Sequence, residues 1–154
     1  MHIRRAVNSE ISDVVELIGD LLNEIMEVMG QPFFQFERER AIEQAQKFLE
    51  EEKYFVLVAC DGNKVVGMIS AYESYALYAQ GAFGTIPECY VIPEYRGQSV
   101  GKRLIEAMIE FARHKNWHRL EVTTPPLPEF ADSLRFYEQN GFEISGGKKL
   151  KISL

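Results

Sequence analysis

The stretch PECYVIPEYRGQSVGKRL, residues 87–104, decides the fold of this chain. Strand-forming residues at 89–92 are stopped by Pro93, and apolar residues recur at helical spacing from Leu104 onward. The segment between them, residues 96–102, is therefore a glycine-bearing loop that leads into a helix. At a helix N-terminus the first backbone N–H groups lack intrahelical partners and the dipole is positive, so this loop suits an anionic group such as a pyrophosphate.

The loop residues fit that interpretation. Gly97 and Gly101 allow the backbone to approach a ligand closely, while Arg96 and Lys102 add positive charge. An ordinary strand-to-helix turn could use the same two glycines, so the loop alone leaves both interpretations open.

The wider pattern resembles the acetyl-CoA signature of the GNAT superfamily of N-acetyltransferases, R/Q-x-x-G-x-G/A, in which the loop holds the pyrophosphate of the cofactor. The resemblance rests on Arg96, Gly101, Val91, Pro93, Glu94 and Tyr95. A second stretch, SLRFYEQNGF at residues 133–142, resembles the family's A-x-x-F/L-Y-x-x-x-G-F. Ser99 departs from the signature, because glycine is usual there and a Cβ limits close approach. Its hydroxyl can cap the helix or reach a phosphate oxygen.

This resemblance implies that acetyl-CoA binds to the loop and to the strand before it. The expected cofactor-binding residues are Cys89, Tyr90, Val91, Arg96, Gly97, Gln98, Ser99, Val100, Gly101, Lys102, Ser133 and Tyr137. In the family the strand before the loop separates from its neighbour, and we expect the backbone N–H of Val91 to face the thioester oxygen. Phe130 stands where the family often has an asparagine that contacts the cofactor, so we expect that contact to be missing.

Acetyl transfer to an amine needs a base and a proton donor, since a free alkylamine has a pKa of about 10. Glu88 lies where several GNAT enzymes carry an acidic base; the alternative is a solvent-facing glutamate, with Glu121 as a weaker candidate base. Tyr137 matches the family tyrosine that acts as general acid toward the thiolate. The alternative for Tyr137 is a core residue on the apolar stripe that Phe130 and Leu134 begin.

The segment MGQPFFQF, residues 29–36, interrupts a helical pattern with Gly and Pro. Its phenylalanines either fold onto the core or line a pocket. In GNAT proteins the connection between the first two helices borders the acceptor site. The resemblance therefore implies substrate binding by Phe33, Phe34 and Glu88.

The composition narrows the class of protein. A chain of 154 residues that is 46% hydrophobic suits one domain over residues 1–154. The net charge of −6 disfavours nucleic acid as a partner and mildly favours a cationic acceptor. We see no leader and no apolar run that could cross a membrane, so we expect a cytoplasmic protein without a membrane partner. Cys60 and Cys89 are expected to be small buried residues, with a nucleophilic role as the less favoured alternative for Cys89, and we expect no metal site.

The periodicities predict an ordered set of elements. These are a strand at 2–7, a helix capped by Asn8 or Ser9, a helix at 37–51, hairpin strands at 54–60 and 64–72, a strand at 83–91, a helix to 115, a strand at 119–123, a helix at 130–139 and a closing hairpin at 142–154. This order resembles the GNAT-like acyl-CoA N-acyltransferase fold, an α/β fold whose mixed central sheet has helices on both faces.

The expected function is transfer of an acetyl group from acetyl-CoA to a primary amine by direct attack in a ternary complex. The acceptor is expected to be small and either cationic or amino-acid-like. A protein lysine or N-terminal acetyltransferase is the alternative among enzymes. Ser99 and Phe130 motivate a non-catalytic acyl-CoA-binding module, and the basic apolar tail motivates an interaction subunit. A homodimer through that tail is also considered.

Overall fold

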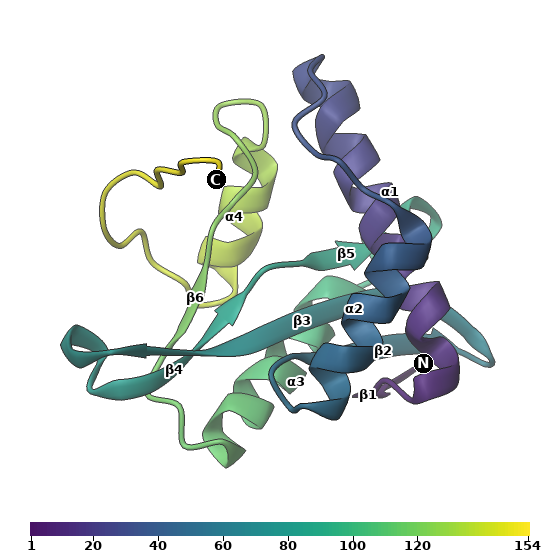
Figure 1. Ribbon diagram of the computed structural model, residues 1–154, viewed down its shortest axis with the longest axis horizontal. Helices are drawn as coiled ribbons and strands as arrows, with labels where there is room; N and C mark the ends of the chain where they lie inside the picture. The colour runs from purple at the N-terminus through teal and green to yellow at the C-terminus, as the bar shows by residue number, and fades with distance from the viewer. The chain divides into compact units, whose positions relative to one another are not determined.

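The computed structural model describes residues 1–154, in which a mixed β-sheet carries helices (Figure 1). The chain forms two compact units, residues 1–123 and residues 124–154. The first unit contains β1 (His2–Arg5), η1 (Asn8–Glu10), α1 (Ile11–Met29), α2 (Arg38–Glu50), β2 (Phe55–Asp61), β3 (Lys64–Ala76), η2 (Leu77–Ala79), β4 (Gly81–Ile86), β5 (Cys89–Val91), η3 (Pro93–Tyr95), α3 (Val100–His114) and β6 (Leu120–Val122). The second contains α4 (Ala131–Gln139).

The sheet has the strand order β1-β2-β3-β4-β6, and β5 pairs with β3. All pairs are antiparallel except β4 with β6. The expected hairpin joins β2 to β3 through residues 61–63, where Gly62 has a φ of +60°. The mixed sheet predicted from the sequence is confirmed.

Helices cover both faces of the sheet in the first unit, as expected. On one face α1 contributes Val14 and Leu17 to a core that contains Val58 and Met68 of the central strands. On the other face α3 buries Leu104, Ile105 and Met108. In Figure 1, α1 and α2 lie in front of the sheet and α3 lies behind it. Residues 55–60 of β2 are buried on both sides for this reason.

The single strand expected at residues 83–91 is wrong, because the segment divides into β4 and β5 at Pro87 and Glu88. Proline has no N–H to give to a ladder, so a strand is interrupted there. The 13-residue β3 pairs with both parts, first with β5 over residues 67–69 and then with β4 over residues 72–76. Only β4 also pairs with β6. Strands β4 and β5 therefore share β3 as a neighbour, but β4 alone has a second neighbour, β6.

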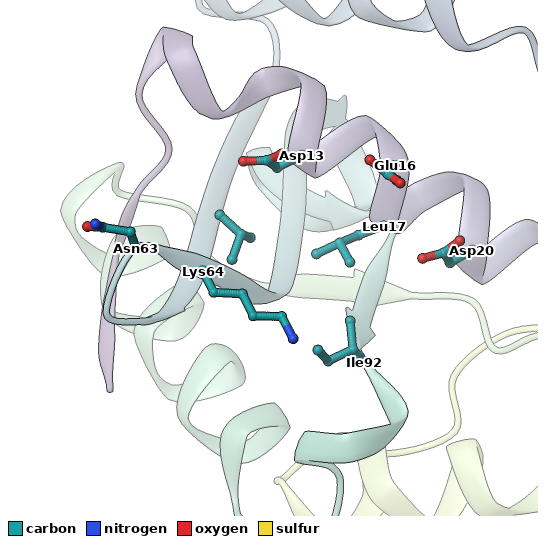
Figure 2. A pocket seen from close by; sticks show the side chains of 8 residues that line it. Asp13, Glu16, Leu17, Asp20, Asn63, Lys64 and Ile92 are labelled. Atoms are coloured by element: carbon teal, nitrogen blue, oxygen red, sulfur yellow. The ribbon is translucent and has the colours of Figure 1, made fainter.

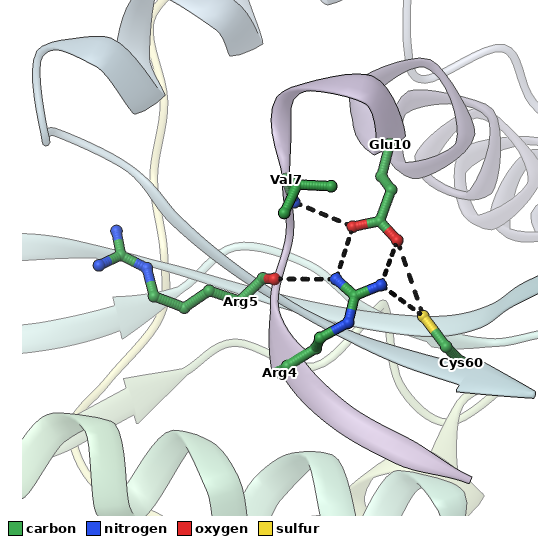
Figure 3. A network of polar contacts seen from close by, with 5 residues as sticks. All are labelled: Arg4, Arg5, Val7, Glu10 and Cys60. Carbon is green, nitrogen blue, oxygen red and sulfur yellow. Dashed lines mark hydrogen bonds and ion pairs between the residues drawn. The ribbon is translucent and has the colours of Figure 1, made fainter. Parts of the chain in front are cut away.

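The start of α1 also differs from the sequence expectation, because neither Asn8 nor Ser9 caps it through a side chain. Instead the Glu10 carboxylate accepts a hydrogen bond from the Val7 N–H at 2.9 Å and two from Arg4 at 2.8 Å. Figure 3 shows Arg4, Glu10 and the buried Cys60 in mutual contact, with the Cys60 Sγ 3.7 Å from the guanidinium and 3.8 Å from the Glu10 carboxylate. This network fastens β1 and β2 to the start of α1.

In the second unit α4 ends near Gly141, whose φ is +95°. The closing hairpin expected at residues 142–154 is wrong, since no strand forms there. Leu150, Ile152 and Leu154 are exposed. Alternating residues define the two faces that a strand would have, but a strand also needs a neighbour to bond with.

Candidate functional site

The loop before α3 presents an open helix N-terminus. The carbonyl of Ser99 accepts the first helical hydrogen bond, from the Arg103 N–H at 3.0 Å, and no side chain caps the helix. The amides of Val100, Gly101 and Lys102 therefore lack intrahelical partners. Gly97 has a φ of +74° and open space where a Cβ would lie, so a ligand can approach the backbone there.

Ser99 does not cap α3 through its side chain, so the capping role, one of the two that the sequence left open for its hydroxyl, is wrong. Its φ is +62° and its ψ is 14°, a left-handed conformation, whereas a capping serine normally has extended backbone angles. Glycine adopts the left-handed region without steric cost. The position thus keeps the backbone shape that glycine favours while carrying serine.

Strand β5 has one bonded edge and one open edge. The Ile92 N–H donates to the Val66 carbonyl at 3.0 Å, and the Ser70 N–H donates to the Glu88 carbonyl at 2.9 Å. Main-chain groups alternate in direction along an antiparallel strand, so those of Tyr90 face β3 and those of Val91 face away from it. Since β6 pairs only with β4, the Val91 N–H has no ladder partner.

Arg96, expected to contribute charge to the loop, is held by other groups. Its Nε donates to the Val91 carbonyl at 2.9 Å, and its two terminal nitrogens donate to Glu24 of α1 at 2.9 and 2.8 Å. The guanidinium also lies 5.2 Å from the ring centroid of Tyr90. The hydrogen bond from Arg96 lowers the pKa of Glu24, and burial raises the pKa of Tyr90 to about 12. Arg96 therefore joins α1 to β5 as an ion-paired side chain.

Glu88 lies immediately before β5, on the opposite face of the sheet from α3, and is half-buried. Its Oε2 accepts hydrogen bonds from the hydroxyls of Tyr54 and Ser70. The Glu88 N–H donates to the Ser70 Oγ at 3.2 Å. Desolvation raises the pKa of Glu88, and the two hydroxyl donors oppose that rise. The solvent-facing alternative for Glu88 does not describe this setting.

Tyr54 and Ser70 were missed by sequence reasoning. Neither belongs to a motif, and 34 and 18 residues respectively separate them from Glu88. The register of the hairpin is the one feature that could have identified them. It pairs Val56 with Ser70, and Tyr54 lies two residues before Val56, so all three side chains point to the same face of the sheet.

The aromatic loop between α1 and α2 does not enter the core at Phe33 and Phe34. Both side chains are exposed, and their rings meet edge to face at 6.4 Å. Phe36 instead packs against α1, where its ring lies 3.0 Å from the position of a Cβ on Gly19. The core alternative is therefore wrong for Phe33 and Phe34.

The second unit holds the other expected site residues. Tyr137 lies on α4, and its ring meets those of Phe136 and Phe142 at 5.2 and 5.5 Å. Ser133 lies in the first turn, where its N–H donates to the Phe130 carbonyl at 3.0 Å.

A pocket of about 390 Å³ lies between α1, the β2–β3 turn and Ile92. Figure 2 shows Asp13, Glu16 and Asp20 of α1 along it and the Lys64 side chain reaching toward Ile92. None of the site residues expected from the sequence lines this pocket. No helix in the structure has the length and apolar character that a membrane span requires.

An open strand edge followed by an uncapped helix N-terminus is the arrangement expected of the acetyltransferase class. Residues 20–142 match the family model described as Acetyltransferase (GNAT) family. The chain therefore belongs to the GNAT family, as its motifs indicated, and is an N-acetyltransferase.

Individual relatives agree with that membership. The aminoalkylphosphonate N-acetyltransferase of Salmonella typhimurium is 29% identical over 143 residues, which cover 93% of this chain and 85% of that protein. The crystal structure of a transcriptional regulator from Bacillus halodurans superposes with a TM-score of 0.80 at 27% identity, covering 99% of each chain. An aminoglycoside acetyltransferase from an uncultured soil metagenomic sample shares the fold, with a TM-score of 0.76 at 23% identity over 99% of this chain and 95% of that one.

Proposed function

We propose that this chain transfers the acetyl group of acetyl-CoA directly to the primary amine of a small molecule. The observation that carries the proposal is the placement of β5 between two functional features. Glu88 precedes this three-residue strand, and the loop to the uncapped start of α3 follows it. A proton acceptor and an anion-binding helix terminus thus flank an open strand edge.

The residues present fit acetyl-CoA. The free amides of residues 100–102 are donors suited to a pyrophosphate, together with the loop residues Gly97, Gln98 and Ser99 and the charge of Lys102. The Val91 N–H on the open edge of β5 would bond the pantetheine arm, and Cys89 and Ser133 are proposed as further contacts. The Tyr90 backbone bonds β3, so its part is the packing of its ring with Arg96. Acetyl-CoA, when bound, supplies the thioester that is attacked.

Three groups of this chain carry the proposed chemistry. Glu88 takes a proton from the acceptor amine, which its raised pKa favours. The Val91 N–H donates to the oxygen on which negative charge develops, an interaction worth several kcal/mol in a dry site. Tyr137 gives a proton to the departing thiolate, since a tyrosine hydroxyl can serve as a general acid.

The acceptor is proposed to be a small amine, bordered by Phe33 and Phe34. The name of the Salmonella relative gives an aminoalkylphosphonate as its acceptor, and that of the metagenomic neighbour gives an aminoglycoside. The first carries negative charge and the second several positive charges. The net charge of −6 on this chain favours the cationic class. We further propose that the protein works in the cytoplasm.

Binding of acetyl-CoA, measured by calorimetry, tests the cofactor site first. We expect micromolar binding by the wild type, and loss of binding in Gly101→Glu, which places bulk and negative charge at the helix terminus. Gly147→Glu is the matched control, because a Cβ at Gly147 meets no atom within 4 Å and this glycine belongs to no proposed site. No binding by the folded wild type would overturn the proposal and favour an interaction subunit.

Turnover is tested next on a panel of aminoglycosides, aminoalkylphosphonates, polyamines, amino acids and lysine peptides, by release of free thiol. We expect Glu88→Gln to lower kcat by about 10²- to 10⁴-fold and Tyr137→Phe to lower it substantially. Binding of acetyl-CoA without turnover on any amine would favour a non-catalytic acyl-CoA-binding module. Preference for the peptides would favour a protein acetyltransferase.

A further inference from the structure

We propose that the Tyr54 and Ser70 hydroxyls are positioning groups that hold Oε2 of Glu88 and leave Oε1 as the oxygen that takes the proton of the acceptor amine. This inference rests on the proposed function, because it assumes that Glu88 is the base. It assigns roles to two residues outside the family motifs.

The two hydroxyls approach the same carboxylate oxygen from different strands. Tyr54 lies just before β2, and Ser70 lies within β3 and is fully buried. Each hydroxyl has one proton, and the shortest contact of each is with Oε2; the Tyr54 hydroxyl also lies 3.3 Å from Ser70 Oγ, and Ser70 Oγ lies 3.4 Å from the Glu88 carbonyl oxygen. Oε1 accepts no hydrogen bond from the protein. One oxygen of Glu88 is thus held by two donors, and the other is available.

Ser70 also fixes the backbone of Glu88. Its Oγ accepts from the Glu88 N–H at 3.2 Å, and its own N–H donates to the Glu88 carbonyl at 2.9 Å. Glu88 is therefore held at its main chain and at its carboxylate by one side chain that is itself buried in the core. A side chain held in this way reaches its productive geometry without loss of further conformational freedom.

The position of the proton follows from this arrangement. When the base acts, an N–H bond of the ammonium or attacking amine breaks, its electron pair stays on nitrogen, and an O–H bond forms on the carboxylate. Oε2 already accepts from two donors, so the new O–H bond forms on Oε1. The proton later leaves to solvent, and no other reactant is needed.

The electrostatic surroundings of Glu88 are simple enough to test. Tyr54 is the titratable group that contacts it, and Tyr72 of β3 interacts with Tyr54. Burial raises the pKa of Tyr54, which keeps its hydroxyl protonated as a donor. Loss of that donor removes an interaction that favours the ionised form of Glu88, so the pKa of Glu88 must rise further.

The first experiment needs no acceptor. NMR titration of ¹³C-labelled glutamate carboxyls identifies the Glu88 signal as the one absent in Glu88→Gln. We expect Tyr54→Phe to move the titration of Glu88 to higher pH, and Ser70→Ala to do the same. Tyr75→Phe is the matched control, because the exposed Tyr75 hydroxyl donates to another carboxylate, Glu73, at 2.5 Å. An unchanged Glu88 titration in a folded Tyr54→Phe protein would overturn the inference.

The second experiment measures the pH dependence of kcat/KM for each variant with the best amine of the panel. We expect the acidic limb of kcat/KM to move to higher pH in Tyr54→Phe and to stay in place in Tyr75→Phe. The same acceptor amine is used in every assay, so its own ionisation affects every pH profile equally. A shift of the acidic limb between variants therefore reports a change in the pKa of a group on the protein. At high pH, where Glu88 is ionised in both proteins, kcat/KM of Tyr54→Phe should fall by less than the roughly 100-fold expected for removal of the base.

The outcomes separate the two proposals. Full turnover by Glu88→Gln would remove Glu88 as the base and overturn the proposed chemistry, whatever Tyr54→Phe does. Loss of turnover in Glu88→Gln with an unmoved limb in Tyr54→Phe would leave the base in place and overturn the positioning roles alone.

Discussion

Arg96 and Glu24 form a two-bond ion pair, at 2.9 and 2.8 Å, that connects the last third of α1 to the segment after β5. A third hydrogen bond runs from Arg96 to the carbonyl of Val91. The side chain that matches the family signature therefore fixes the orientation of the strand whose open edge is proposed to meet the cofactor. Its charge is balanced by Glu24 before any ligand arrives.

Arg96→Lys should weaken this connection. The three donors of a lysine ammonium all lie on one nitrogen, so they do not reproduce the planar fork that reaches both Glu24 oxygens and the Val91 carbonyl from three different nitrogens. We expect a loss of about 1 kcal/mol in the free energy of unfolding, kept small by exposure of the pair, and a higher KM for acetyl-CoA. Urea unfolding and steady-state kinetics measure both. Arg103→Lys on α3 is the control, because Arg103 makes a single bond, to the Met1 carbonyl at 3.3 Å; an equal effect there would contradict the assignment.

Ser99→Gly should stabilise the protein by up to about 1 kcal/mol, because glycine adopts the left-handed conformation of residue 99 without steric cost. The gain is limited because glycine also adds conformational freedom to the unfolded chain. It should also tighten acetyl-CoA binding by removing the Cβ beside the helix terminus. Thermal unfolding and calorimetry check the two effects.

Gln80→Gly separates the two effects of Ser99→Gly. Gln80 also has a left-handed conformation, with a φ of +60°, and it lies outside the proposed site. We expect it to alter stability in the same direction and to leave acetyl-CoA affinity unchanged. A matching change in affinity would mean that the effect at residue 99 comes from general stability.

The loop and its helix could be predicted from the sequence because their signals are local. Pro93, the two glycines and the apolar spacing after Lys102 mark the boundaries by themselves. The contacts of Arg96 could not be predicted, since Glu24 is 72 residues away and nothing in either segment indicates the pairing. For the same reason the sequence indicated Glu88 but not the two hydroxyls that hold it.

Glu88→Gln should raise the melting temperature at neutral and alkaline pH. The folded-state pKa of Glu88 is raised by burial, so the wild type loses stability as the pH rises from the unfolded value of about 4.3 through the raised one. Glutamine bears no charge and can still accept from both hydroxyls. The difference in Tm should therefore shrink on acidification. A variant less stable than the wild type at every pH would show that Glu88 is held mainly for structure.

Glu10→Gln should destabilise the protein by about 1 kcal/mol at pH 7, since it weakens the Arg4 pair that Figure 3 shows. The hydrogen bond from Arg4 lowers the pKa of Glu10. The stabilisation is therefore present above the unfolded value of about 4.3 and is lost as the pH falls through the lowered one. Denaturation at several pH values measures this, with Glu51→Gln in an exposed pair as a control that should change little.

Long-range pairing also explains which fold expectations failed. The split at Pro87 depends on β3 being long enough to serve two partners, and the tail remains unpaired because alternation alone supplies no neighbour. Both are properties of segments that meet in space, whereas periodicity describes one segment at a time. The helices and the β2–β3 hairpin, whose signals lie within a few residues, were predicted correctly.

Because one edge of β5 is open, hydrogen exchange of its backbone amides can show whether a ligand is bound to that edge. Along this strand the Tyr90 amide is bonded to β3 and should exchange its hydrogen slowly, while the adjacent Val91 amide has no ladder partner and should exchange fast. Any molecule that bonds the free edge will slow the second and leave the first unchanged. The ratio of two neighbouring exchange rates thus measures whether the edge is covered, without a label and before the acceptor is known.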